Sequence, residues 1–100
     1  MDMLQYRLTQ EFSVIHNIVC QLASIKAIVR EIEADEINFK PYLEDLPDGV
    51  SPRLLFYLAD RQEERLYTIG QLKKLEANLS TDLRQASSNL GRLVRSLRNS

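Results

Sequence analysis

His16 and Cys20 come closest to a catalytic pair, because a spacing of four residues places them on neighbouring parts of one helical face. A thiolate beside an imidazole can act as the nucleophile in acyl transfer. That chemistry also needs an oxyanion site and a group that orients the imidazole, and the sequence indicates no cleft to hold them. We therefore interpret Cys20 as a small apolar packing residue and His16 as its neighbour at the edge of that packing. We predict no catalytic residue and no enzymatic activity.

The sequence also predicts no metal, no cofactor and no small-molecule substrate. One His and one Cys fall short of the three or four ligands that a metal ion such as zinc requires. Seven acids lie between residues 31 and 48, but they lack the spacing and the loop glycine of a calcium-binding EF-hand. No glycine-rich phosphate loop is present. A solvated, acidic stretch of chain is the simpler interpretation.

Arginines near the C-terminus form a possible basic strip. No acid follows Asp82, whereas Arg84, Arg92, Arg95 and Arg98 do. Arg84 and Arg95 are three helical turns apart and share a face. Such a strip suits phosphates, but no aromatic residues alternate with it, and the formal net charge of -1 predicts no general attraction to nucleic acid. A helical nucleic-acid-binding module is therefore the alternative function. Contacts with a partner protein explain the arginines equally well.

The first element that must position these residues is a long amphipathic helix at about 3–37. Apolar residues recur there at steps of three or four from Leu4 to Ile32. Further apolar residues widen the face between Phe12 and Val29, so that one antiparallel helix would cover only part of it. Because several uncovered Val or Ile side chains would each forfeit about 1.5 to 3 kcal/mol of burial, we infer at least two helical neighbours, one of them from another chain.

The acidic stretch fits poorly with the end of this helix, because negative charge near a helix C-terminus opposes the helix dipole. Either the helix ends earlier than residue 37, or the acids meet basic groups elsewhere. The arginines of another subunit are one candidate.

A second helix is predicted at about 51–97. Ser51 and Pro52 supply an N-cap hydroxyl and a proline at the first helical position. From Ile69 to Leu97 the heptad a and d positions are apolar except Glu76, which predicts packing along another helix. Extended backwards, the heptad places Gln62 and Arg65 on this seam, where they hold the register or mark its opening. We predict that the helix continues through Ser80 and Asn89, because the heptad phase does not skip.

The connection at about 38–50 contains Pro41, Pro47 and Gly49, which break the helical period. Its apolar residues predict a folded connection with one short helical turn near residues 42–46. The run from Leu54 to Leu58 is apolar all round, which predicts that it is enclosed. Together these segments form a small apolar knob, a possible partner site, at Tyr42, Leu43, Leu46, Leu54, Phe56 and Tyr57.

These patterns predict one all-α domain over residues 1–100. We expect a long antiparallel helical hairpin or coiled coil that oligomerisation completes as a helical bundle. The predicted function is a non-enzymatic protein–protein interaction subunit, structural or adaptor, whose partner is a second copy or another protein. The predicted protein interface is Phe12, Ile15, Ile18, Val19, Leu22, Ile25, Val29, Leu79, Leu83, Leu90, Leu93 and Leu97.

The cellular location is predicted to be the cytoplasm or the nucleus. One cysteine allows no internal disulfide, which suits a reducing compartment. The first residues lack the basic region of a signal peptide. No uninterrupted apolar run approaches the roughly 18 residues of a membrane span. We therefore expect a soluble protein without membrane contact.

Overall fold

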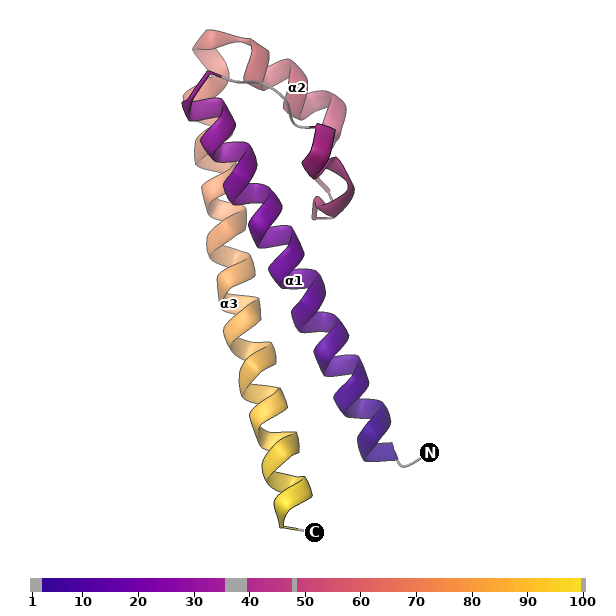
Figure 1. Ribbon diagram of the computed structural model, residues 1–100. Coiled ribbons are helices and arrows are strands. Elements are labelled where there is room, and N and C mark those ends of the chain that lie inside the picture. The colour runs from indigo at the N-terminus through magenta and orange to yellow at the C-terminus, as the bar shows by residue number, and fades with distance from the viewer. Residues whose placement is uncertain (1–2, 36–39, 48, 100) are drawn as a thin grey trace.

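The computed structural model describes residues 3–35, 40–47 and 49–99, and this part of the chain is almost entirely helical (Figure 1). Its elements are α1 (Met3–Glu33), the 3-10 helix η1 (Lys40–Asp45), α2 (Pro52–Asp60), the 3-10 turn η2 (Gln62–Glu64) and α3 (Arg65–Arg98). No strand occurs among the described residues. The predicted all-α class is confirmed.

α1 and α3 are the two long helices, and they pack on each other while running in opposite directions (Figure 1). The molecule measures 57 × 21 × 20 Å, with both termini at one end and α2 at the other, which we call the tip. Leu72, Leu79 and Ala86, one heptad apart on α3, are buried. The prediction that one long helix packs on another is therefore confirmed.

α1 ends at Glu33, and the prediction that it reaches residue 37 is wrong. The N–H of Asp35 donates to the carbonyl oxygen of Ile32 at 3.2 Å, and Asp35 has a left-handed φ of 61°. A residue in this conformation ends a helix, and Asp tolerates it better than most residues other than glycine. The early end keeps part of the acidic stretch out of the helix, where it would oppose the dipole.

The predicted second helix is not continuous from residue 51, because the chain leaves the helix at Arg61. Arg61 is extended, with φ −99° and ψ 113°, and separates α2 from η2. Beyond this break, Arg65 Nε donates to the carbonyl oxygen of Ala59 at 3.0 Å, and the Arg65 guanidinium forms an ion pair with Asp35. Arg65 thus joins the start of α3 to the ends of α1 and α2. Neither predicted role of Arg65 on the seam, holding the register or marking its opening, included this break in the helix.

From Arg65 onwards α3 continues to Arg98 without interruption, so the predicted continuity through Ser80 and Asn89 is confirmed. Gly70 and Gly91 lie inside it and do not break it.

α2 starts as predicted, with the Ser51 hydroxyl accepting the N–H of Leu54 at 3.3 Å and Pro52 as its first residue. η1 corresponds to the predicted short turn in the connection. α2 packs on α3, and η1 packs on α1. The predicted enclosure of α2 is wrong, however, because Leu54 and Tyr57 are each 54% exposed. α2 buries one face, with Leu55 and Ala59, and leaves the other exposed.

Candidate interaction surfaces

In the tip half of the molecule, the side of α1 that faces the rest of the chain is closed to solvent. Ile25 and Ile28 on α1 and Ala59 on α2 have no exposed surface. Side chains of α1, α3 and η1 meet there, because η1 covers a flank of α1 that α3 leaves open. Several predicted interface residues are consequently buried within this one chain: Ile18, Leu22, Ile25, Val29 and Leu79.

The terminal half is open, because α1 and α3 diverge towards the end that holds both termini (Figure 1). Phe12 is 57% exposed and Val19 is 47% exposed, although both belong to the predicted interface. Ile15, Leu83, Leu90 and Leu93 are only half-buried, and Leu97 is exposed. The residue-level prediction missed Val14 and Val94, which are exposed in the same half. No residue of α1 before Ile18 is buried among those the structure describes.

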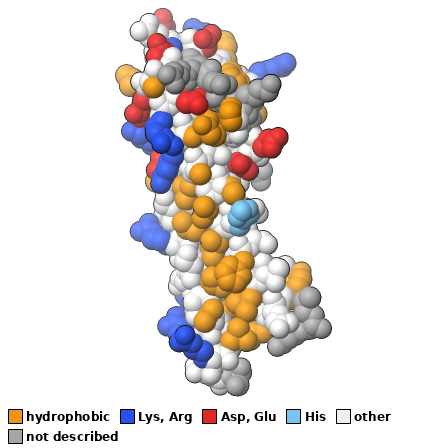
Figure 2. All heavy atoms as spheres, in the orientation of Figure 1, with side chains coloured by type: hydrophobic (Ala, Val, Ile, Leu, Met, Phe, Trp, Pro, Cys, Tyr) orange, Lys and Arg blue, Asp and Glu red, His pale blue; other side chains and the backbone are white. Residues whose placement is uncertain are grey.

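Figure 2 shows this openness from one side. Hydrophobic side chains form a long strip down the visible face towards the end with the termini. Lys and Arg side chains border the strip on its left, over α3, while Asp and Glu side chains gather towards the tip. Apolar and basic surface therefore run side by side along the molecule.

The predicted arginine strip is only partly assembled. Arg84, Arg92, Arg95 and Arg98 are all exposed. An Arg84 nitrogen donates to Thr81 Oγ1 at 3.3 Å, and Arg95 Nε donates to the carbonyl oxygen of Gly91 at 3.3 Å. Arg92 is rotated away from the other three on the helix, and it lines a shallow groove with Arg7 and Glu11 of α1. In the described part of the chain, none of the four forms an ion pair.

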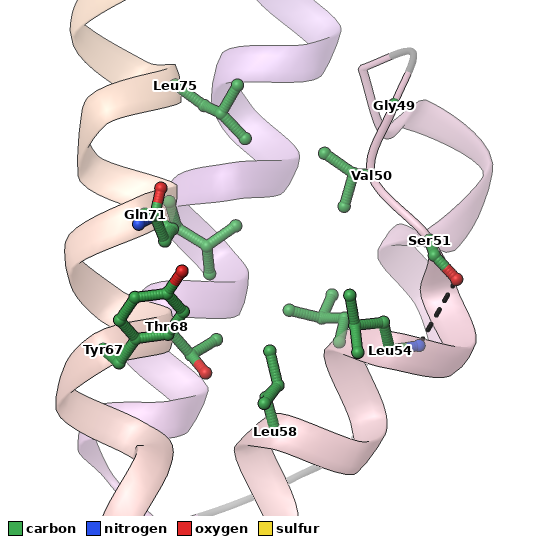
Figure 3. A pocket seen from close by; sticks show the side chains of 11 residues that line it. Gly49, Val50, Ser51, Leu54, Leu58, Tyr67, Thr68, Gln71 and Leu75 are labelled. Carbon is green, nitrogen blue, oxygen red and sulfur yellow. Dashed lines mark hydrogen bonds between the residues drawn. The ribbon is translucent and has the colours of Figure 1, made fainter.

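The knob contains an open groove between α2 and α3, with a volume of about 360 Å³ (Figure 3). Val50, Leu54 and Leu58 project across it towards Tyr67, Thr68 and Leu75 of α3. Of the predicted knob residues whose side chains the structure describes, only Leu54 lines this groove. Tyr67 and Leu58 could not be assigned from sequence, because their places follow from the break at Arg61.

The other predicted knob residues lie elsewhere. Tyr42, Leu46 and Phe56 are half-buried and pack against the core. The hydroxyl of Tyr57 accepts a hydrogen bond from the Arg61 guanidinium, whose carbon lies 5.0 Å from the ring centroid. The side chain of Leu43 lies outside the described residues.

His16 and Cys20 lie together as their spacing predicted, with Cys20 Sγ 3.7 Å from His16 Nε2. Both lie on the outer surface of α1, and a shallow depression beside them is lined by Thr9, Phe12, Ser13 and Asn17 as well as His16. In the part of the chain that the structure describes, no third side chain hydrogen-bonds to the imidazole. The arrangement supplies no orienting group for nucleophilic catalysis. Within those same residues, no cluster of three or more His, Cys, Asp or Glu could hold a metal ion.

α1 is long and apolar enough to cross a membrane, by length and composition alone. The expectation from sequence concerned uninterrupted apolar runs and did not identify this helix. The polar residues of the helix are scattered among apolar ones, so that no uninterrupted run reveals it. A core helix of a soluble protein and a signal sequence have the same length and composition, and one third of the most apolar window is buried against the rest of the chain. The absence of membrane contact stays a prediction.

Comparisons with protein-family models, with curated proteins and with solved structures find no match to this chain. Its function is therefore argued from its own surfaces.

Proposed function

We propose that this chain is a non-enzymatic protein–protein interaction subunit, a structural or adaptor component whose terminal half is completed by another chain. The exposure of Phe12 and Val19 on the outer face of α1 carries this proposal. Burying such a side chain from full exposure is worth about 1.5 to 3 kcal/mol. Because Phe12 and Val19 are about half exposed, a partner would gain about half of that from each. Two neighbouring exposed apolar residues on one helix offer a partner a larger apolar contact area than an isolated one does.

In this proposal α1 and α3 act as a long antiparallel helical hairpin whose heptad seam runs to Leu97. A partner helix packs beside the diverging ends and completes a helical bundle of an intracellular complex, as in other bundles in which each helix buries a broad apolar face. The contacts at the tip support this view, because the fully buried Ile28 lies in the part of α1 on which η1 packs in addition to α3.

The test is the molar mass of the purified chain by light scattering over a concentration series at about 0.1 M and 1 M salt. The mass of one chain is 11.6 kDa. At 1 M salt the screening length falls to about 3 Å, so apolar attraction should dominate between copies. We expect the mass to rise with concentration there. The double substitution Phe12→Ser and Val19→Ser should hold it at that of one chain with unchanged helix content.

Tyr57→Ser is the matched control, because Tyr57 is equally exposed but lies at the tip. It should leave the association unchanged. A wild-type chain that remains soluble at 11.6 kDa in both salts and at every concentration would show that a second copy does not complete the terminal half. Together with a failure to bind any partner helix, that result would overturn the proposal.

The alternative function, a helical nucleic-acid-binding module, draws support from the exposed arginines of α3. Fluorescence anisotropy with a labelled DNA duplex distinguishes the two. Affinity for the duplex that falls steeply with salt and disappears when Arg84, Arg92, Arg95 and Arg98 are changed to Gln would favour this alternative. Under our proposal the duplex does not bind measurably at about 0.15 M salt.

A further inference from the structure

We propose that the chain binds an acidic amphipathic helix of a different protein along one face of the α1–α3 pair. This inference rests on the proposed function and names the partner's chemistry. The face, called here the basic face, carries two sets of side chains. They are Phe12, Val19, Ala23, Lys26 and Arg30 from α1, and Lys73, Arg84, Arg95 and Arg98 from α3.

The α1 residues form one continuous flank. From Phe12 through His16, Val19, Ala23 and Lys26 to Arg30 the steps are four and three, which keeps them on one side of the helix. All of them are exposed. The flank that η1 covers is a different one, because Ser24, Ala27 and Ile28 are buried. The apolar part of this flank lies towards the terminal half and its basic part towards the tip.

Two observations place the basic residues of α3 beside this flank. Lys73 Nζ lies 3.8 Å from Glu33 Oε1, and Glu33 follows Arg30 by three residues along the same side of α1. A shallow groove of about 420 Å³ lies over the junction of the helices, lined by Lys26, Val29 and Arg30 of α1 and by Glu76 of α3. Arg84, Arg95 and Arg98 continue the α3 side at helical spacing. Figure 2 shows Lys and Arg side chains along the left border of the hydrophobic strip.

The charge of this face argues against a second copy as its occupant. The carboxylates beside it are those of Glu33 and Glu76, and Lys and Arg outnumber them. Among the described residues, Lys73 is the one cation of the face with an ion-pair partner. Two copies with these faces together would bring unpaired cations close to one another, and like charges across an interface cost affinity.

The shape favours a helix over a flat surface. The hydrophobic strip lies along the pair of helices and is bordered by basic side chains (Figure 2). A third helix that packs beside two others buries a stripe of residues at steps of three and four. Asp and Glu on its flanks would meet Lys26, Arg84 and Arg95, and its apolar stripe would cover Phe12 and Val19. We therefore place an anionic membrane second, as an outcome of the test.

Two synthetic 28-residue peptides test the inference. Both carry Leu at heptad positions a and d, and they differ only at e and g, where one has Glu and the other Lys. Fluorescence anisotropy at about 50 mM salt measures their binding to the full chain. We expect the Glu peptide to bind at least about tenfold more tightly than the Lys peptide, because opposite charges attract and like charges repel across the interface.

Charge reversal supplies the decisive comparison. The order of affinity for the two peptides should invert in a triple variant with Lys26→Glu, Arg84→Glu and Arg95→Glu. Arg53→Glu, Lys74→Glu and Arg92→Glu change the net charge equally at exposed positions off the basic face, and they should preserve the order. Phe12→Ser should lower the affinity for the Glu peptide about tenfold or more, both in the wild-type chain and in the variant with the three control substitutions. Circular dichroism checks that every variant keeps its helix content.

The failures are distinguishable. Equal binding of both peptides, with loss on Phe12→Ser, would overturn the acidic partner and leave the proposed function standing. A dimer at low salt that Phe12→Ser dissociates would make a second copy the occupant. Binding to phosphatidylglycerol vesicles without binding of the Glu peptide would make an anionic membrane the occupant of the basic face. No peptide binding, with a mass of 11.6 kDa at both salts, would overturn the inference and the proposed function together.

Discussion

The two halves of α1 share one apolar face and have different surroundings. In the tip half, Ile25 and Ile28 are fully buried between α3 and the segments that follow α1. In the terminal half, Phe12 keeps more than half of its surface exposed, and α3 is the element that packs on α1 there among the described residues. The broad apolar face between Phe12 and Val29 extends from one half into the other. The difference teaches that α3 alone cannot bury the broad apolar face of α1. A third element is needed wherever that face is to be fully buried.

The chain itself supplies that third element at the tip. η1 packs on α1 and α2 packs on α3, and the Arg65 contacts with Asp35 and the Ala59 carbonyl connect these parts. In the terminal half no described segment plays this role. The proposed partner helix would be the third element there, on the flank of α1 that carries Phe12 and Val19 and not on the flank that η1 covers at the tip.

Truncations in the two halves test the comparison with the largest expected effect. Ile28→Ala should lower the free energy of unfolding by about 3 kcal/mol, because it removes a fully buried side chain. Phe12→Ala should lower it by less than about 1 kcal/mol, although it removes more atoms, since Phe12 is largely exposed. Urea denaturation of the monomer measures both. Equal losses would mean that the terminal half is as closely packed as the tip.

Arg65 is expected to give the next largest effect, confined to the tip. Arg65→Met should cost about 1 to 2 kcal/mol of folding free energy, because the Ala59 carbonyl loses a charged donor. Asp35→Asn should cost less than about 0.5 kcal/mol, since the Asp35 side chain is 71% exposed and its ion pair is screened by water. Urea denaturation of the two variants separates the contribution of the Arg65–Ala59 hydrogen bond from that of the Arg65–Asp35 ion pair. A larger loss for Asp35→Asn than for Arg65→Met would assign the stability to the ion pair instead.

The glycines of α3 give the smallest effect and compare the halves without side-chain packing. A Cβ added at Gly70, near the tip, or at Gly91, in the terminal half, would meet no atom within 4 Å. Gly70→Ala and Gly91→Ala should each raise the melting temperature, by a gain of about 0.5 to 1 kcal/mol in unfolding free energy. The gains should be similar, because helix propensity does not depend on the neighbouring helix. A loss of helix content on Gly91→Ala would contradict the continuity of α3.

Much of the architecture followed from periodicity. The steps of three and four along α1, the Ser51 cap and the heptad of α3 predicted the helices and their packing, because each signal is local. The residues at which the helices end could not be predicted equally well. Asp35 in a left-handed conformation is not a typical stop signal, and its contact with Arg65 depends on the fold.

The break at Arg61 shows the same limit. No proline or glycine lies between Asp60 and Arg65, so the sequence indicated a continuous helix. The turn is stabilised by tertiary contacts of Arg65, which periodicity does not report. The groove lined by Tyr67 and Leu58 is a consequence of that turn. The broad apolar face of α1 was predicted, but which of its residues the chain covers itself depends on where η1 and α2 pack.

Native-state hydrogen exchange along α1 and α3 tests the central claim most directly. Amides of residues 22–32 and 68–79 should exchange near the rate set by global unfolding, because the tip half opens only with the whole fold. Amides of residues 7–15 and 86–95 should exchange at least about tenfold faster, through openings of the terminal half alone. Addition of the Glu peptide should slow this second set. Uniform protection of both halves in the isolated chain would contradict the account, because the terminal half would then be complete without a partner.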